Sequence, residues 1–276
     1  MKTVTLPDGE KVPALGQGTW MMGERHDRRA AEIAALRAGV EQGMTLIDTA
    51  EMYGEGAAET LIAEALGDVR DALFLVSKAY PQNVSHQRLA TACEASLKRL
   101  GTDRLDLYLL HWRGSVPLGE TVEAMEALLS AGKIRHWGVS NLDTDDMVEL
   151  RAAGGRNCAT NQILYNLTRR GAEHDLLEWL SDHAMPAMAY SPVEQGRLLA
   201  NPSLAKIADT INATAAQVAL AWSMQRGNII AIPKAGTVAH VQENRAAADL
   251  VLSEADLAAL DGAFPRPNRR RPLEML

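Results

Sequence analysis

Short apolar runs rich in strand-forming residues alternate with longer amphipathic stretches along most of this chain, and this alternation constrains the fold most. The runs lie at 45–48, 73–76, 105–110, 134–139, 187–190 and 229–232. Between them apolar residues recur at helical spacing, as they do at Leu89, Ala92, Cys93, Ser96, Leu97 and Leu100. Alternating strands and helices indicate parallel strands joined by crossovers, and therefore either a closed barrel or an open doubly wound sheet.

Turn and cap residues support this pattern. The segment Val4 to Pro13 predicts a hairpin that turns at Pro7-Asp8-Gly9. Thr214 is placed to cap a helix that begins at Ala215. Glycines stand where helices are expected to end in a left-handed conformation, at positions 43, 67, 101, 132 and 227.

A barrel is favoured over a dinucleotide-binding open sheet. The open sheet predicts a GxGxxG motif after its first strand, and the glycines at 16, 18 and 23 have the wrong spacing. The length of 276 residues suits one barrel of roughly 250 residues. We therefore expect a single (β/α)8 TIM-barrel domain, an α/β fold, over residues 1–276 with an N-terminal β-hairpin.

Charge and cysteine content exclude several classes of protein. The formal net charge of −7 disfavours a nucleic-acid partner. The two cysteines, Cys93 and Cys158, are too few for a disulfide framework and suggest a reducing cytoplasm. We expect neither a signal peptide nor a membrane span, because no apolar run is long enough. We expect a monomer or a weak homo-oligomer.

Polar residues lie at or just after the ends of the predicted barrel strands. Each one alone is more often a cap or a solvated charge, but the carboxyl ends of barrel strands converge on one site. Seven such positions therefore predict one shared pocket. They are Asp48, Lys78, His111, Ser140-Asn141, Gln162, Tyr190 and Lys234.

Four residues within this set and next to it suit proton transfer at a carbonyl oxygen. A phenol such as that of Tyr53 ordinarily titrates near pH 10. We expect the ammonium of Lys78 to lower that pKa and Asp48 to keep the lysine charged. His111 would orient the substrate oxygen across the pocket. No pair of histidines has metal-ligand spacing, and no GxSxG motif occurs, so neither a metal site nor a simple hydrolase is expected.

These residues resemble the motifs of the aldo-keto reductase family, and the resemblance runs over nearly the whole chain. DTAEMYG at 48–54 resembles the family's aspartate and catalytic tyrosine. LKRLGTDRLDLYLLHW at 97–112 resembles the family's helix, fourth strand and catalytic histidine. KIRHWGVSN at 133–141 resembles its fifth strand. The resemblance implies Tyr53 as the general acid or base, Lys78 and Asp48 as its tuning pair, and His111 as the orienting group.

The resemblance also implies a nicotinamide cofactor, with residues assigned to each part of it. Ser140, Asn141 and Gln162 would bind the carboxamide, and Tyr190 would stack on the ring. The pyrophosphate loop would comprise Ser191, Pro192, Val193, Glu194, Gln195, Gly196 and Leu198. Lys234 and Thr237 would bind the 2′-phosphate, and Glu243 and Asn244 the adenine. Further cofactor contacts are implied at Gly18, Thr19, Trp20 and Ile232.

The cofactor motif departs from the family at two positions. His240 stands where an arginine is usual, and Ala235 stands where a serine is common. Histidine is a weaker cation and cannot form the same planar contact with a phosphate. We expect NADPH as the cofactor because Lys234 and Thr237 remain, with NADH as the alternative.

The expected activity is reversible reduction of small aldehydes or ketones, and two alternatives stay open. One is a nicotinamide-binding regulatory or redox-sensing barrel without significant turnover. The other is an aldolase-like barrel with Lys78 as the Schiff-base nucleophile. Candidate substrate contacts are Trp20, Trp112 and Arg113, in a pocket that the short loop after His111 and the brief segment after Pro265 leave open.

Overall fold

The protein is a closed barrel of parallel strands in a computed structural model that describes residues 1–276. Eight strands pair in the order β10-β9-β8-β7-β6-β5-β4-β3, and every pair is parallel. Parallel bridges from Leu15 to Ala231 and from Gly18 to Lys234 join the first strand to the last. The strands are β3 (Gln17–Gly18), β4 (Leu46–Asp48), β5 (Phe74–Ala79), β6 (Leu105–Leu110), β7 (Ile134–Ser140), β8 (Cys158–Leu164), β9 (Ala187–Tyr190) and β10 (Ile229–Ala231).

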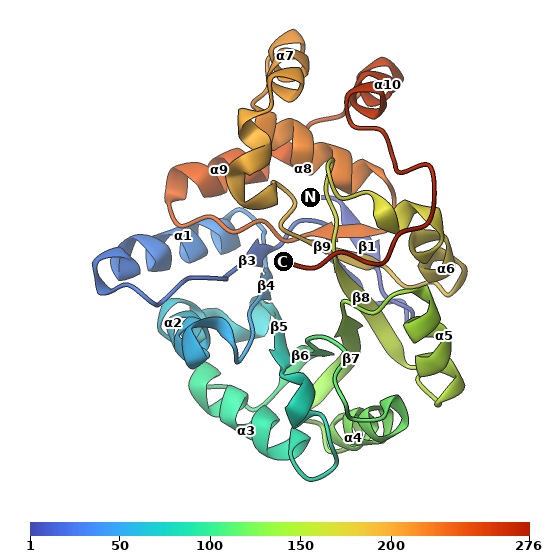
Figure 1. Ribbon diagram of the computed structural model, residues 1–276. Helices are drawn as coiled ribbons and strands as arrows, with labels where there is room; N and C mark the ends of the chain where they lie inside the picture. The colour runs from blue at the N-terminus through green and yellow to red at the C-terminus, as the bar shows by residue number, and fades with distance from the viewer.

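A ring of helices surrounds the strands, and α7 and α10 project beyond it on one side (Figure 1). The predicted helices form where the apolar spacing placed them, and the Thr214 side chain caps α8 by accepting from the Gln217 amide. The helices are α1 (Arg29–Glu41), α2 (Ala57–Leu66), α3 (Leu89–Leu100), α4 (Leu118–Ser130), α5 (Thr144–Ala152), α6 (Leu176–Asp182), α7 (Pro202–Thr210), α8 (Ala215–Gln225), α9 (Val238–Ala247) and α10 (Glu254–Ala263). No helix has the length and apolar character needed to cross a membrane.

The apolar core has two layers because the barrel strands are buried on both faces. One layer of 50 buried residues includes Tyr108 and Leu110 of β6 and lies between the strands and the helices. A second layer of 23 buried residues includes Leu107 and Leu109 from the other face of β6, together with residues of α1, α8 and α9. Successive residues of a strand point to opposite faces, so one apolar strand contributes to both layers.

An N-terminal hairpin closes one end of the barrel. It comprises β1 (Thr3–Thr5) and β2 (Lys11–Pro13), paired antiparallel around the predicted turn. Its apolar residues Val4, Leu6 and Val12 belong to the second layer, which includes Leu107 and Leu109.

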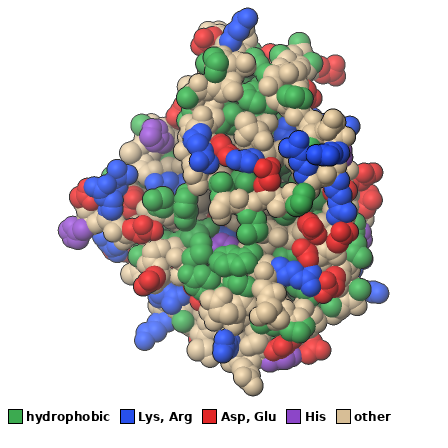
Figure 2. Space-filling view, in the orientation of Figure 1, with side chains coloured by type: hydrophobic (Ala, Val, Ile, Leu, Met, Phe, Trp, Pro, Cys, Tyr) green, Lys and Arg blue, Asp and Glu red, His purple; other side chains and the backbone are tan.

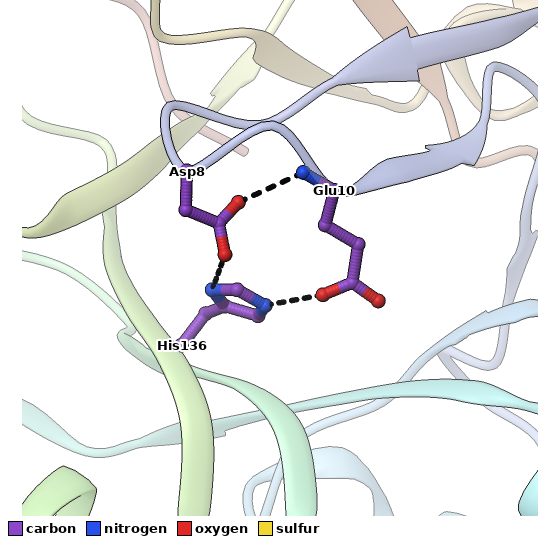
Figure 3. A group of neighbouring side chains, drawn as sticks. All are labelled: Asp8, Glu10 and His136. Carbon is purple, nitrogen blue, oxygen red and sulfur yellow. Dashed lines mark hydrogen bonds and ion pairs between the residues drawn. The ribbon is translucent and has the colours of Figure 1, made fainter.

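An ionic clasp, which we define as Asp8, Glu10, Arg135 and His136, fixes this hairpin to the start of β7. Figure 3 shows Asp8, Glu10 and His136 of this clasp. Glu10 Oε2 lies 2.7 Å from His136 Nε2 and 2.7 Å from an Arg135 nitrogen. Asp8, Glu10 and His136 have the residue types of a metal site. Because the Arg135 guanidinium contacts Glu10, a protein cation already balances this carboxylate, and we interpret the clasp as structural.

The predicted (β/α)8 fold and hairpin are confirmed, with one local exception. Glycines 43, 101, 132 and 227 have the predicted positive φ angles. Gly67 does not, since its φ is −59° and the chain continues from it into a 3-10 turn over Gly67–Ala72. A helix that continues as a tighter turn needs no left-handed residue at its end.

Candidate active site

The predicted polar residues meet at the end of the barrel opposite the hairpin. On the face that Figure 2 shows, the molecule is hollowed at the barrel centre, with apolar side chains around the hollow and a histidine inside it. Ser140 ends β7 and His111 directly follows β6, as the sequence predicted. Lys78 and Gln162 lie inside β5 and β8, because both strands extend beyond their predicted ends.

Lys78 is the centre of the site and is fully buried. Its Nζ lies 2.8 Å from Asp48 Oδ2, 2.8 Å from the Thr49 carbonyl oxygen and 3.1 Å from Tyr53 Oη. An ammonium has three protons to donate, so these three oxygens use its whole capacity. Tyr53 reaches the lysine from the 3-10 turn Tyr53–Gly56, which follows β4.

The pKa of Tyr53 departs from the prediction. Burial of the phenol raises its pKa, and the nearby Lys78 ammonium, which acts in the opposite direction, does not fully offset that effect. The pKa is therefore above its usual value near 10, and the predicted lowering is wrong. A buried phenol resists ionisation because the low-dielectric surroundings disfavour its charged form. Burial also opposes the charge on Lys78, but Asp48 and Tyr53 outweigh it and raise the lysine pKa.

His111 is a neutral imidazole beside the phenol. Burial and the charge of Lys78 lower its pKa to about 2. Its ring lies 5.9 Å from the Tyr53 ring, centroid to centroid, in an edge arrangement. Its Nδ1 is buried and has no hydrogen-bond partner.

The predicted nicotinamide residues are joined by hydrogen bonds. Ser140 Oγ donates to the Gln162 carbonyl at 2.9 Å, and the Gln162 side-chain amide donates to Asp48 Oδ1 at 2.7 Å. Asn141 has a positive φ of 60° and accepts the Tyr190 hydroxyl proton at 2.9 Å. These contacts connect the predicted carboxamide site to Asp48.

The predicted pyrophosphate loop has an unusual backbone and contains a buried carboxylate. Glu194, Gln195 and Gly196 all have positive φ angles. Glu194 is buried and lies 2.8 Å from an Arg169 nitrogen and 3.3 Å from an Arg197 nitrogen. Sequence reasoning missed both arginines. Arg169 follows a strand by several residues, so strand-end reasoning gave no signal for it.

The predicted adenine and 2′-phosphate residues lie along α9 and the segment before it. Lys234, Thr237 and His240 are exposed. The Thr237 side chain caps α9 by accepting from the His240 amide at 3.3 Å, so helix capping alone accounts for a threonine at this position. Glu243 and Asn244 follow within the same helix.

The remaining predicted cofactor residues line the seam where the barrel closes. Gly18 pairs with Lys234 across this seam. A Cβ on Gly18 would lie 2.8 Å from the Ile232 carbonyl oxygen, so the seam requires glycine. Thr19 donates its hydroxyl proton to the Asp48 carbonyl at 2.9 Å, which fixes the loop that carries Trp20.

Trp20 and Trp112 lie where they can contact a substrate, whereas Arg113 forms ion pairs with other residues. Trp20 is 42% exposed, and the Trp112 ring lies 4.8 Å from the His111 ring. Arg113 forms ion pairs with Asp146 and Glu149, and these carboxylates balance its charge. We therefore do not propose it as a substrate contact.

The C-terminal segment corrects the expectation of an open pocket. The chain returns across the barrel and ends near its centre (Figure 1). Glu274 lies 2.5 Å from Arg169, and the Leu276 backbone lies against the Tyr190 hydroxyl. The segment is short, but it runs towards the site rather than away from it.

Comparison with known proteins identifies the family. The profile described as "Aldo/keto reductase family" matches residues 14–264. This chain belongs to the aldo/keto reductase family. It is therefore an oxidoreductase that acts on carbonyl groups.

Relatives match this chain over at least nine-tenths of their own length. Methylglyoxal reductase YeaE of Escherichia coli (strain K12) is 54% identical over 100% of this chain and 99% of the relative. Glyoxal reductase of Bacillus subtilis (strain 168) is 32% identical over 94% of this chain and 91% of the relative. An aldo/keto reductase from Klebsiella pneumoniae, solved in complex with NADP and acetate, has a TM-score of 0.97 at 50% identity over 100% and 99% of the two chains.

Proposed function

We propose that this aldo/keto reductase reduces small aldehydes and ketones with NADPH, and that Tyr53 is its proton donor. The contact that carries this proposal is the 3.1 Å separation between Lys78 Nζ and Tyr53 Oη. It supports a phenol that is protonated at rest and whose anion an adjacent cation stabilises.

The raised pKa of Tyr53 suits an acid better than a base at rest. When NADPH is bound, it supplies the hydride that adds to the carbonyl carbon. Negative charge then grows on the carbonyl oxygen, which takes the proton from Tyr53 Oη. Lys78 stabilises the phenolate left behind, and Asp48 balances the lysine. Preorganised charge of this kind is among the largest contributions to enzymatic rate.

Neutral His111 suits a hydrogen-bonding role towards the substrate oxygen. A pKa of about 2 leaves it uncharged over the whole physiological range, so it does not compete with Tyr53 as the proton source. A neutral imidazole can still donate one hydrogen bond. We propose that it orients the carbonyl between Tyr53 and the cofactor.

The residues present fit a nicotinamide. Gln162 uses its amide nitrogen on Asp48, which leaves its amide oxygen to accept from a carboxamide. Ser140 and Asn141 lie beside it, and Tyr190 contacts Asn141. At the other end, the exposed ammonium of Lys234 supports a preference for the 2′-phosphate of NADPH. We propose a modest preference, because His240 cannot form a bidentate phosphate contact.

The Schiff-base alternative conflicts with the geometry of Lys78. A nucleophilic amine must be deprotonated and have a free lone pair. Lys78 contacts three oxygens, and its pKa is raised. The regulatory alternative makes a different prediction, because a barrel of that kind would bind NADPH without consuming it.

The relatives suggest the substrate class to test first. Their names indicate reduction of methylglyoxal and glyoxal by those proteins. We propose small 2-oxoaldehydes as substrates of this protein too.

A panel of methylglyoxal, glyoxal, simple aldehydes and sugars, assayed by NADPH oxidation, tests this proposal. Turnover strongest for 2-oxoaldehydes supports it. Tight NADPH binding without any oxidation would favour the regulatory alternative.

Other expectations from the sequence are also proposed here. A cytoplasmic location is supported by the two buried free cysteines. A monomer or weak homo-oligomer without a nucleic-acid partner remains a prediction, and gel filtration with light scattering tests the oligomeric state.

A further inference from the structure

Glu51 lies two residues before Tyr53 and has contacts that the proposed chemistry does not use. Its Oε1 accepts hydrogen bonds from the Tyr80 backbone amide at 2.6 Å and from Asn83 Nδ2 at 3.0 Å. No lysine, arginine or histidine forms an ion pair with it. A half-buried carboxylate held only by neutral donors on another loop suggests a positional role.

The two donors belong to the loop after β5, and Glu51 belongs to the loop after β4. The Glu51 amide also donates to the Lys78 carbonyl at 3.3 Å. Both ends of the residue therefore contact the neighbouring strand and its loop. This arrangement fixes the start of the turn on which Tyr53 lies.

The loop after β5 in turn contacts the loop that begins at His111. The Tyr80 ring lies 5.9 Å from the Trp112 ring in an edge arrangement, and Trp112 lies 4.8 Å from His111. Gly114 approaches Pro81 so closely that a Cβ on the glycine would lie 2.6 Å from the proline Cβ. Side-chain contacts therefore connect the loop after β4 to the loop after β5, and the loop after β5 to the loop after β6.

We propose that Glu51 is a positioning residue that holds Tyr53 at its working distance from His111 by fixing the loop after β4 to the Tyr80–Asn83 segment. The inference rests on the proposed function, since it assumes that the phenol and the imidazole act on one carbonyl oxygen. Displacement of a reacting group by about 1 Å costs on the order of a hundredfold in rate, so a tether of this kind affects turnover more than binding.

Two substitutions at Glu51 distinguish the effect of its hydrogen bonds to Tyr80 and Asn83 from the effect of its negative charge. Glu51→Gln keeps an oxygen that can accept from Tyr80 and Asn83, whereas Glu51→Ala removes the acceptor. We expect Glu51→Ala to lower kcat for methylglyoxal by about tenfold, with the NADPH Kd changed by less than about twofold. Glu51→Gln should keep kcat within about threefold of the unsubstituted protein.

A substitution at Gly114 perturbs the same linkage from its other end, and a substitution at Gly67 is its control. Gly114→Ala should lower kcat because its Cβ displaces Pro81. Gly67→Ala is the matched control, since its Cβ would meet nothing within 4 Å and its φ of −59° suits alanine. We expect the control to leave kcat unchanged. If Glu51→Ala does not fold, Gly114→Ala and Asn83→Ala test the same linkage.

A double-mutant cycle with His111→Gln distinguishes positioning from a general structural role. If Glu51 acts through the distance between Tyr53 and His111, Glu51→Ala costs less in the His111→Gln background than alone. The inference would be overturned if Glu51→Ala folds and keeps its kcat, or if Glu51→Gln and Glu51→Ala lower kcat equally. Strictly additive effects of Glu51→Ala and His111→Gln on kcat would also overturn it. Absence of turnover in the unsubstituted protein would instead refute the proposed function.

Discussion

The side-chain amide of Gln162 donates a 2.7 Å hydrogen bond to Asp48 Oδ1, the carboxylate oxygen that Lys78 does not contact. One residue of the proposed cofactor site therefore contacts the Asp48 oxygen that the lysine leaves free. Two side chains, Asp48 and Lys78, connect Gln162 to the Tyr53 hydroxyl through hydrogen bonds.

Gln162→Leu removes this donor while keeping nearly the same volume. It leaves one oxygen of a buried carboxylate without a partner, which typically costs about 1–3 kcal/mol. We expect this one variant both to unfold at lower urea concentration and to bind NADPH more weakly. Denaturant unfolding and fluorescence titration measure the two effects, and a variant with unchanged stability and affinity would show that the contact has no such role.

Lys78→Met should abolish turnover and destabilise the fold. The change leaves the buried Asp48 carboxylate without its cation, and breaking a buried ion pair in this way costs about 3–5 kcal/mol. In the double variant Asp48→Asn/Lys78→Met, stability should largely recover while turnover should not.

Glu10→Gln provides a control for the Lys78 variants at the opposite end of the barrel. It weakens the ionic clasp, so it should lower the thermal midpoint without changing kcat. Turnover by Lys78→Met at the unsubstituted rate would contradict the role given to the lysine.

His111 should make the fold sensitive to acid. Its pKa is about 2 in the folded protein but near 6.5 in an unfolded chain, so below pH 6.5 only the unfolded state takes up this proton. The imidazole thus removes about 1.4 kcal/mol of stability per pH unit on acidification below that point, and has no effect above it.

His111→Gln removes this dependence. We expect unfolding free energies measured between pH 7 and 5 to fall less steeply in the variant than in the unsubstituted protein. Parallel curves would show that the imidazole is protonated in the folded state. The same reasoning predicts no change in kcat near pH 6.5 that arises from His111.

Much of the fold could be predicted because the strands are short, apolar and separated by helices whose apolar residues recur at regular spacing. The Thr214 cap and the hairpin turn at Gly9 are local features, and local sequence determines them. The strand-end rule likewise brought Asp48, Lys78 and His111 together, because barrel geometry makes such positions converge.

The parts that sequence reasoning missed depend on contacts between distant segments. Glu51 contacts a loop about 30 positions further along the chain, and Arg169 contacts both Glu194 and Glu274. The pKa of Tyr53 was predicted in the wrong direction because the lysine is visible in a motif, whereas the depth of burial is not.

Lys234→Ala should weaken NADPH binding and leave NADH binding unchanged. An exposed ammonium that contacts the 2′-phosphate contributes only when that phosphate is present, and high salt should reduce the difference between the two cofactors. Isothermal titration with each cofactor at low and high salt measures both effects. Equal weakening for NADPH and NADH would place the lysine elsewhere in the cofactor site.

The central claim is that Tyr53 supplies the proton, and single-turnover NADPH oxidation by methylglyoxal in Tyr53→Phe tests it most directly. The substitution removes one oxygen and keeps the ring that packs near His111. We expect the NADPH Kd to stay within about twofold and the oxidation rate to fall by about 10²–10⁴-fold, the usual contribution of a positioned acid. Oxidation at the unsubstituted rate in Tyr53→Phe would contradict the account.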